Sequence, residues 1–231
     1  MNRQDLFEQS ASVIRISRYL TACGGDWSRA EQLYLANINL SSRLFAVLCV
    51  FEVTLRNAID RHYCHQFGAA VTSTDWFVSQ TEATGFLSHR SLAKGSFQSK
   101  QNVLKVISDL GGRYTHDRAV SELSFGFWKY MFASKEFAAA GSTLLRVFPA
   151  RPKGINHTDV YNRLNSINRL RNRIAHHQPI CFDRSGHVSI IEATEAYSNA
   201  VTILSWLGFE PAELLSGVDN VLAELNVVQA I

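Results

Sequence analysis

Apolar residues recur along most of this chain at spacings of three, four and seven, the period of an α-helix. The pattern predicts helices over residues 5–22, 28–67, 99–110, 121–132, 134–147, 158–177, 190–207 and 212–225. Forty residues without interruption are long for a globular helix, so we expect a break near Asn37-Ile38-Asn39. A turn at Asp183-Arg184-Ser185-Gly186 predicts a short hairpin-like excursion. The predicted fold class is all-α, a helical bundle formed as a single domain over residues 1–231.

Composition agrees with a globular helical protein. Hydrophobic residues make up 46% and charged residues 19%, while four prolines and 13 glycines favour long helices over many short strands. The chain starts without a signal-peptide pattern, and its longest apolar run, 44–53, is too short to cross a bilayer. We therefore expect a cytoplasmic protein without a membrane partner. The four cysteines lack paired spacing, which predicts buried, reduced thiols.

The segment Leu44–Ile59 is apolar almost all round, which predicts a central and fully packed helix. Two ionisable residues interrupt it, Glu52 and Arg56, which lie four apart and therefore on one face; Asn57 follows. A glutamate inside a buried helix must be paired or neutralised. These three polar residues are predicted to support a functional site.

The densest cluster of chemically capable side chains is the stretch 168–179, which combines arginine, histidine and amide groups without an acid. At about 100° per residue, one arc of the predicted helix is apolar and faces the core. This arc contains Val160, Leu164, Ile167, Leu170 and Ile174, with Arg171 inside it. A polar stripe on the opposite side contains Asn165, Arg169, Asn172 and His176, and Arg173 and His177 lie between the two.

An arginine on an apolar arc stays charged and needs an acceptor. Because Glu52 is the acid embedded in a comparably apolar helix, we predict that Glu52 and Arg171 approach each other, with Arg56 nearby. His176 lies at a helix C-terminus and could exchange a proton near neutrality. Arginine, asparagine and histidine together suffice for metal-independent RNA cleavage, because the 2′-hydroxyl of the substrate supplies the nucleophile.

Residues 171–177 resemble the R-x4-6-H motif of HEPN-domain ribonucleases. The chain as a whole resembles the Abi-like family of bacterial abortive-infection proteins, over about residues 28 to 180. Four segments in order carry the resemblance: Ala30-Glu31-Gln32-Leu33-Tyr34, Phe51 to Ile59, Phe125-Gly126-Phe127-Trp128, and Leu170 to Pro179.

The resemblance implies a HEPN-like bundle that forms a homodimer, so that two copies of the motif complete one cleft. It implies an endoribonuclease of phage defence, in an abortive-infection or toxin–antitoxin system, with RNA and a possible antitoxin protein as partners. Arg171, Asn172 and His176 match the motif, and His177 is the alternative to His176. Arg169 and Arg173 are expected to bind RNA, and no cofactor or metal is expected.

Two other interpretations remain open. The chain could be a non-catalytic HEPN-like module that binds RNA or a protein through the arginine helix. It could instead be a metal hydrolase that uses His62, His65, His176 and His177.

Overall fold

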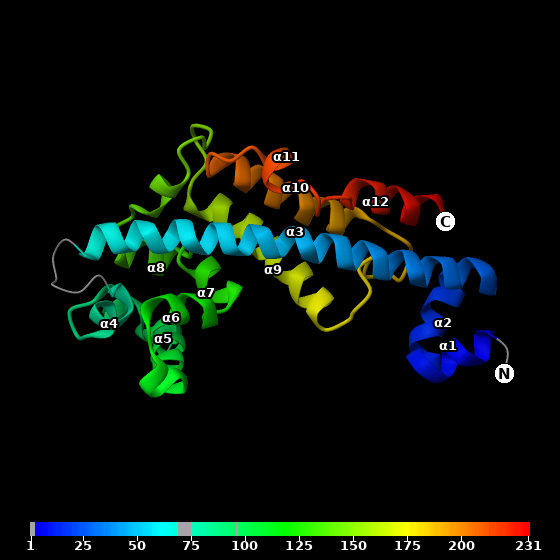
Figure 1. Ribbon diagram of the computed structural model, residues 1–231, viewed down its shortest axis with the longest axis horizontal. Coiled ribbons are helices and arrows are strands. Elements are labelled where there is room, and N and C mark those ends of the chain that lie inside the picture. Colours follow the sequence, from blue (N-terminus) through cyan, green and yellow to red (C-terminus); the bar gives the residue numbers. More distant parts are fainter. Residues whose placement is uncertain (1–2, 69–74, 96) are drawn as a thin grey trace. The chain divides into compact units, whose positions relative to one another are not determined.

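The computed structural model describes residues 3–68, 75–95 and 97–231 (Figure 1). The α-helices are α1 (Arg3–Ala11), α2 (Val13–Ala22), α3 (Trp27–Gly68), α4 (Trp76–Thr81), α5 (Gln98–Leu110), α6 (His116–Glu122), α7 (Phe125–Tyr130), α8 (Ser134–Ala139), α9 (His157–Ala175), α10 (Ile191–Trp206), α11 (Pro211–Leu214) and α12 (Val221–Ala230). Short 3-10 helices occur at Phe86–Ser88, Arg90–Gly95, Gly111–Arg113 and Leu144–Val147. The all-α prediction is confirmed for the described residues, whose one extended pairing is a Phe182–Val188 bridge in the expected hairpin-like excursion.

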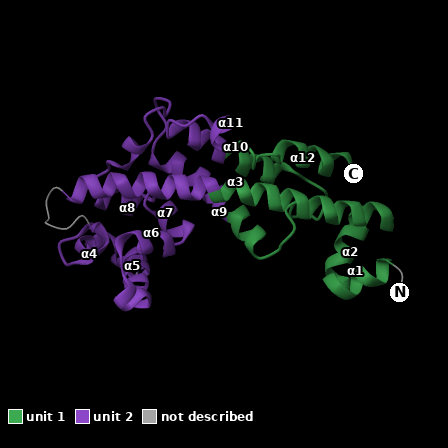
Figure 2. Ribbon diagram, viewed as in Figure 1, with its two compact units in different colours: residues 1–49, 169–199, 215–231 green, residues 50–168, 200–214 purple. Residues whose placement is uncertain are grey.

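The chain divides into two compact units, which Figure 2 colours separately. Unit 1 comprises Met1–Cys49, Arg169–Asn199 and Leu215–Ile231, and unit 2 comprises Val50–Asn168 and Ala200–Leu214. Helices α3, α9 and α10 contribute residues to both units. The single domain over residues 1–231 stays a prediction.

Several helices differ in extent from the periodic pattern: the predicted helix 134–147 ends at Ala139, and the predicted helix 212–225 is replaced by α11 and α12. At two further places the difference involves a side chain that bonds to backbone groups. The predicted helix 5–22 is divided at Ser12, whose φ of 72° ends α1 and whose hydroxyl accepts from the Arg15 N–H to begin α2. The predicted break near Asn37 is wrong, since α3 runs unbroken for 42 residues. The Asn37 side chain forms tertiary hydrogen bonds, described below, and the backbone stays helical.

The core of unit 1 is formed by α2, the first half of α3, the end of α9, the start of α10, and α12. Its buried side chains include Ile16, Tyr19, Leu33, Leu40, Leu44, Leu170, Ala193, Ala196, Val221, Leu225 and Val228. The apolar residues of α3 are therefore inside at helical spacing, as the pattern predicts.

The core of unit 2 is strongly aromatic. Trp76, Phe77, Phe127 and Trp128 are buried and contact one another, with ring centroids between 4.1 and 6.4 Å apart. The predicted helix 121–132 is interrupted at Leu123, and Ser124 caps α7 by accepting from the Phe127 N–H. Core packing therefore accounts for this aromatic segment.

Helix α3 is less enclosed than its composition predicts. Val53 is exposed, and Glu52 is half-buried, so the segment Leu44–Ile59 is not packed on every side. Cys49 is also exposed, which corrects the prediction of a buried thiol there, while Cys23 and Cys181 are buried. By length and composition α3 could cross a membrane, contrary to the expectation from its longest apolar run, although core helices of soluble proteins meet the same criterion.

Candidate functional site

Helix α9 ends in a hydrogen-bonded cap at the two motif histidines. The Gln178 N–H donates to the Arg173 carbonyl at 2.8 Å, and the His177 N–H donates to the Ile174 carbonyl at 2.9 Å. These two bonds form a Schellman motif, in which the residue at the position of His177 adopts a left-handed conformation and is usually glycine. His177 has a φ of 54°. A side chain is thus held where the backbone would favour glycine.

The apolar arc predicted for α9 is confirmed by burial. Val160, Leu164, Ile167 and Leu170 are buried, and Ile174 and Arg171 are half-buried. On the opposite face Arg169, Asn172 and His176 are exposed, as is His177 beyond the helix end. The predicted polar stripe is therefore available to solvent in its C-terminal part.

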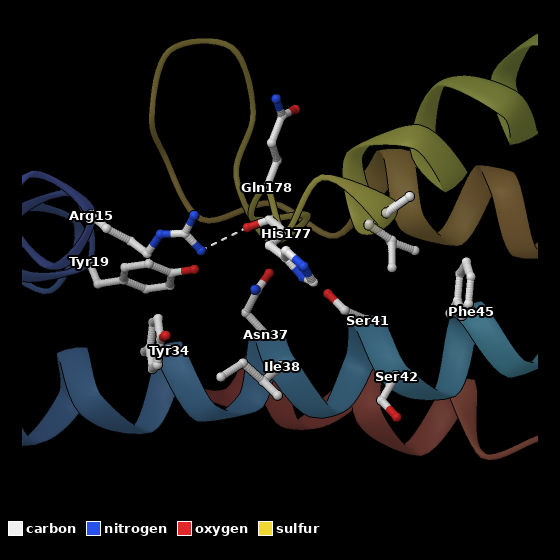
Figure 3. A pocket seen from close by; sticks show the side chains of 12 residues that line it. Arg15, Tyr19, Tyr34, Asn37, Ile38, Ser41, Ser42, Phe45, His177 and Gln178 are labelled. Atoms are coloured by element: carbon white, nitrogen blue, oxygen red, sulfur yellow. Dashed lines mark hydrogen bonds between the residues drawn. The ribbon is translucent and has the colours of Figure 1, made fainter. Parts of the chain in front are cut away.

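His177 lies in a groove of about 640 Å³ within unit 1. Arg15 and Tyr19 line it from α2, and Figure 3 shows the His177 imidazole pointing toward α3 while Gln178 points away from it. Helix α3 lines the rest of the groove with Tyr34, Asn37, Ile38, Ser41, Ser42 and Phe45, and α9 adds Ile174 and Ala175. The lining combines a cation, an imidazole, hydroxyls and aromatic rings, a set that suits a phosphate with an attached base.

Two long-range contacts fix the backbone around this groove. Arg15 Nη1 donates to the His177 carbonyl oxygen at 2.8 Å. Asn37 is buried, and its Oδ1 accepts from the N–H of Ile180 at 2.8 Å and of Cys181 at 3.3 Å. The chain that follows the motif is therefore held by α2 on one side and by α3 on the other.

The buried groups beside the groove are neutral at physiological pH. Burial raises the pKa of the Tyr19 phenol, and burial also raises the pKa of the Cys181 thiol to about 12. Tyr19 therefore contributes a neutral hydroxyl to the groove.

A second groove, of about 480 Å³, lies along the exposed face of α9 in unit 1. Its lining residues are Arg18, Arg169, Asn172, Arg173, Phe182, Asp183, Arg184 and Glu192. The Arg18 guanidinium stacks on Phe182, 4.5 Å from the ring centroid. Arg173 forms an ion pair with Glu192 and donates to the Pro179 carbonyl, so it also braces the end of α9. This groove is cationic and suits a nucleic-acid backbone.

The motif residues are consequently distributed between two surfaces. Asn172 belongs to the second groove, His177 belongs to the first, and His176 is exposed outside both sets of lining residues. The predicted supporting residues Glu52, Arg56 and Asn57 are half-buried in unit 2, whereas Arg171 is in unit 1. The approach of Glu52 to Arg171 stays a prediction.

The four histidines of the metal-hydrolase interpretation do not belong to one compact unit. His62 and His65 are in unit 2, and His176 and His177 are in unit 1. His62 Nε2 lies 2.9 Å from the Thr143 hydroxyl, and His65 is exposed. Burial lowers the pKa of His62, which keeps that ring neutral.

The groove residues of α2 and α3 are not among the site residues predicted from the sequence. Arg15 and Arg18 are three apart in the first predicted helix, so they share a face, and this pair was the available signal. Asn37 is a polar residue within an apolar helical pattern, and this position favoured a helix break over a tertiary hydrogen bond. Its true partners are 143 and 144 residues away.

Comparison with known proteins finds no matching family model, no matching curated protein and no matching solved structure.

Proposed function

We propose that this protein is a metal-independent endoribonuclease of the HEPN type, similar to the Abi-like abortive-infection proteins, and that it acts in phage defence. The first groove binds the scissile phosphate and a neighbouring base, and the second groove binds the RNA backbone. The motif match favours His176, with His177 as the alternative; we propose the reverse order, because His177 lines the first groove. Arg171 and Asn172 are the other residues of the motif; Asn172 lines the second groove, and Arg171 is outside the lining of both grooves.

One observation carries this proposal: His177 occupies a position whose backbone favours glycine, and its ring faces a groove that also contains Arg15. A left-handed conformation costs a non-glycine residue roughly 1–2 kcal/mol. Strain of this kind clusters where a side chain has a chemical task. A histidine is also the side chain best suited to proton transfer near pH 7.

The chemistry requires no group beyond those of the chain and the RNA. The 2′-oxygen attacks the adjacent phosphorus as its proton passes to a base, and the bond from phosphorus to the 5′-oxygen breaks as that oxygen gains a proton. The products are a 2′,3′-cyclic phosphate and a 5′-hydroxyl. The histidine serves as acid or base, and a guanidinium stabilises the charge on the phosphorane oxygens. Arg15 keeps further N–H donors for this role, because its bond to His177 uses one of five.

We further propose that the active form is a homodimer. Support comes from exposed apolar side chains of α3: Ile38, which lines the first groove, is 45% exposed, and Leu35, three residues before it on the helix, is 39% exposed. Exposed apolar residues that gather beside a groove are typical of interaction surfaces. A second copy on this surface would bring two histidine motifs to one cleft. An antitoxin protein would act by covering the same surface.

The test is cleavage of RNA by the purified full-length protein in the presence of EDTA. We expect cyclic phosphate ends, and a loss of activity of about 100-fold or more in His177→Ala, as for removal of a general acid or base. His65→Ala is the matched control, because His65 is exposed on α3 in unit 2. Activity lost in His176→Ala but kept in His177→Ala would assign the reaction to His176. Cleavage that EDTA abolishes would contradict the proposal.

The second candidate is a non-catalytic module that binds RNA or a protein. The second groove favours it, because Arg18, Arg169 and Arg184 line a surface that contains no histidine. RNA binding without cleavage, weakened in Arg169→Ala and with a reduced salt dependence, would support this candidate over the first.

A further inference from the structure

Three potential metal ligands converge in unit 2, far from the arginine–histidine motif in the sequence. Asp60 and Cys64 are one turn apart on α3 and therefore share a face, and His116 is the first residue of α6. The ligand atoms of these three residues all lie within 4.8 Å of one another, and each residue is half-buried. We propose that Asp60, Cys64 and His116 bind a divalent transition-metal ion, with Zn²⁺ as the ion that the donor set favours.

The distances between the three ligand atoms are within about 0.5 Å of the edges of a tetrahedral zinc site. His116 Nε2 is 2.8 Å from Asp60 Oδ1, and Cys64 Sγ is 3.7 Å from each of these atoms. Tetrahedral zinc with ordinary bond lengths separates nitrogen and oxygen ligands by about 3.3 Å and sulfur from either by about 3.5 Å. Small side-chain rotations, of a few tenths of an ångström at each ligand atom, are enough to admit the ion.

Several donors crowd one carboxylate oxygen of this cluster. Three donors approach Asp60 Oδ1: the Trp76 indole N–H at 2.8 Å, His116 Nε2 at 2.8 Å and the more distant Cys64 thiol. One carboxylate oxygen offers about two lone pairs. A cation between the oxygen, nitrogen and sulfur atoms would be shared by all three.

The imidazole is held in the orientation that a metal ligand needs. His116 Nδ1 lies 3.2 Å from Asp75 Oδ1, and Asp75 is itself fixed by the Tyr114 hydroxyl at 2.7 Å and by capping α4. The His116 ring also stacks on Phe77, with centroids 4.9 Å apart. A carboxylate that accepts from Nδ1 leaves Nε2 free to bind the metal, and this carboxylate–histidine–metal arrangement is common around zinc.

The donor set selects the class of ion. Thiolate, imidazole and carboxylate together suit Zn²⁺ and related transition metals, and the thiolate disfavours Mg²⁺ and Ca²⁺. Three protein ligands leave a fourth position, which water fills. The ion would join α3 to α6 and so stabilise unit 2.

The charges of the site stay balanced when the ion enters. One dication replaces two protons: that of the Cys64 thiol and the one that lies between His116 Nε2 and Asp60 Oδ1.

The test is metal binding by the full-length protein, measured without reference to RNA cleavage. We expect zinc to bind with a stoichiometry of one per chain in competition with a chromophoric chelator, and to raise the melting temperature. Cobalt in its place should give a thiolate-to-cobalt charge-transfer absorption. Cys64→Ser should abolish that absorption, and Asp75→Asn should weaken zinc binding by about 10–100-fold, as expected of a residue that orients a ligand.

Cys49→Ser is the matched control, because Cys49 is the exposed thiol of the same helix. It should leave the cobalt spectrum unchanged. If the wild-type protein retains no zinc after gel filtration and gives no charge-transfer absorption with cobalt, the cluster is a hydrogen-bonded link between helices and the proposal is overturned. This outcome comes from the wild-type chain and does not depend on whether a variant folds. It also leaves the ribonuclease proposal unaffected.

Discussion

The guanidinium of Arg15 donates a 2.8 Å hydrogen bond to the main-chain carbonyl of His177, across 162 residues of sequence. The carbonyl belongs to the residue whose backbone is left-handed, so the bond helps to hold the cap of α9. Helix α2 is thereby part of the candidate site, although the family resemblance begins only near residue 28.

Arg15→Ala should lower RNA cleavage by about 10–100-fold while secondary structure is kept, because the guanidinium proposed to stabilise the phosphorane oxygens is removed from an exposed position. Single-turnover cleavage rates and circular dichroism would measure this. Arg43→Ala is the matched control, since Arg43 is an exposed arginine of unit 1 outside the lining of either groove. Equal rates in the two variants would exclude Arg15 from the site.

His177→Gly should separate stability from activity. Glycine adopts a φ of 54° without strain, so the free energy of unfolding is expected to stay equal or to rise by up to about 1 kcal/mol. Cleavage should fall as far as in His177→Ala. Urea denaturation and RNA cleavage on the same preparation test both. A variant that loses stability and activity together would show that the histidine has a structural role.

Asn37→Ala should destabilise unit 1 by about 1–3 kcal/mol, because two backbone N–H groups lose their acceptor in a buried place. Asn37 is only 6% exposed, so water does not easily replace its side chain. Hydrogen exchange should become faster at Ile180 and Cys181. Asn39→Ala is the control, because Asn39 is exposed two residues along the same helix, and its exchange pattern should match the wild type.

Lys129 of unit 2 is buried, and its ammonium donates to the neutral amide oxygen of Asn165 at 2.9 Å. Burial lowers the pKa of Lys129. A lysine whose folded pKa is below its unfolded pKa opposes folding at neutral pH, and this cost fades as the pH rises through the folded pKa towards the unfolded value. Lys129→Met should therefore be neutral or stabilising by about 1–2 kcal/mol at pH 7.

The advantage of Lys129→Met over the wild type should shrink as the pH is raised towards 10, because the wild-type lysine then folds as the uncharged amine. Urea denaturation of both proteins across this pH range measures the difference in their free energies of unfolding. Tyrosine titration affects both proteins equally, so it does not contribute to this difference. Lys135→Met, at an exposed lysine of α8, should show no such trend. A destabilised Lys129→Met variant would indicate that the contacts of the ammonium with Asn165 and with the Tyr130 and Tyr161 rings outweigh its burial.

The sequence by itself determined the helical fold class and the internal geometry of α9. Helical periodicity depends on neighbours three and four residues apart, so it places Leu164 and Leu170 inside and Asn172 and His176 outside without knowledge of other elements. Helix ends were harder to predict from the sequence, because a single side-chain hydrogen bond can decide where a helix begins, as at Ser12. The sequence also did not predict the full length of α3. An asparagine among apolar residues can either end a helix or bond a distant loop through its side chain, and the local pattern is the same in both cases.

Only the tertiary structure decided which residues surround the motif. Arg15 reaches His177 and Asn37 reaches Ile180 over more than 140 residues, and no local pattern records a contact at such separation. The same holds for Asp60, Cys64 and His116. A helical spacing of four relates the first two residues, whereas His116 joins them only through tertiary packing. Trp76 bonds Asp60 and Phe77 stacks on His116, so the core of unit 2 holds the cluster together. The order of residues decides which side chains share one face of a helix, whereas the packing of buried surfaces decides which helices contribute side chains to one site.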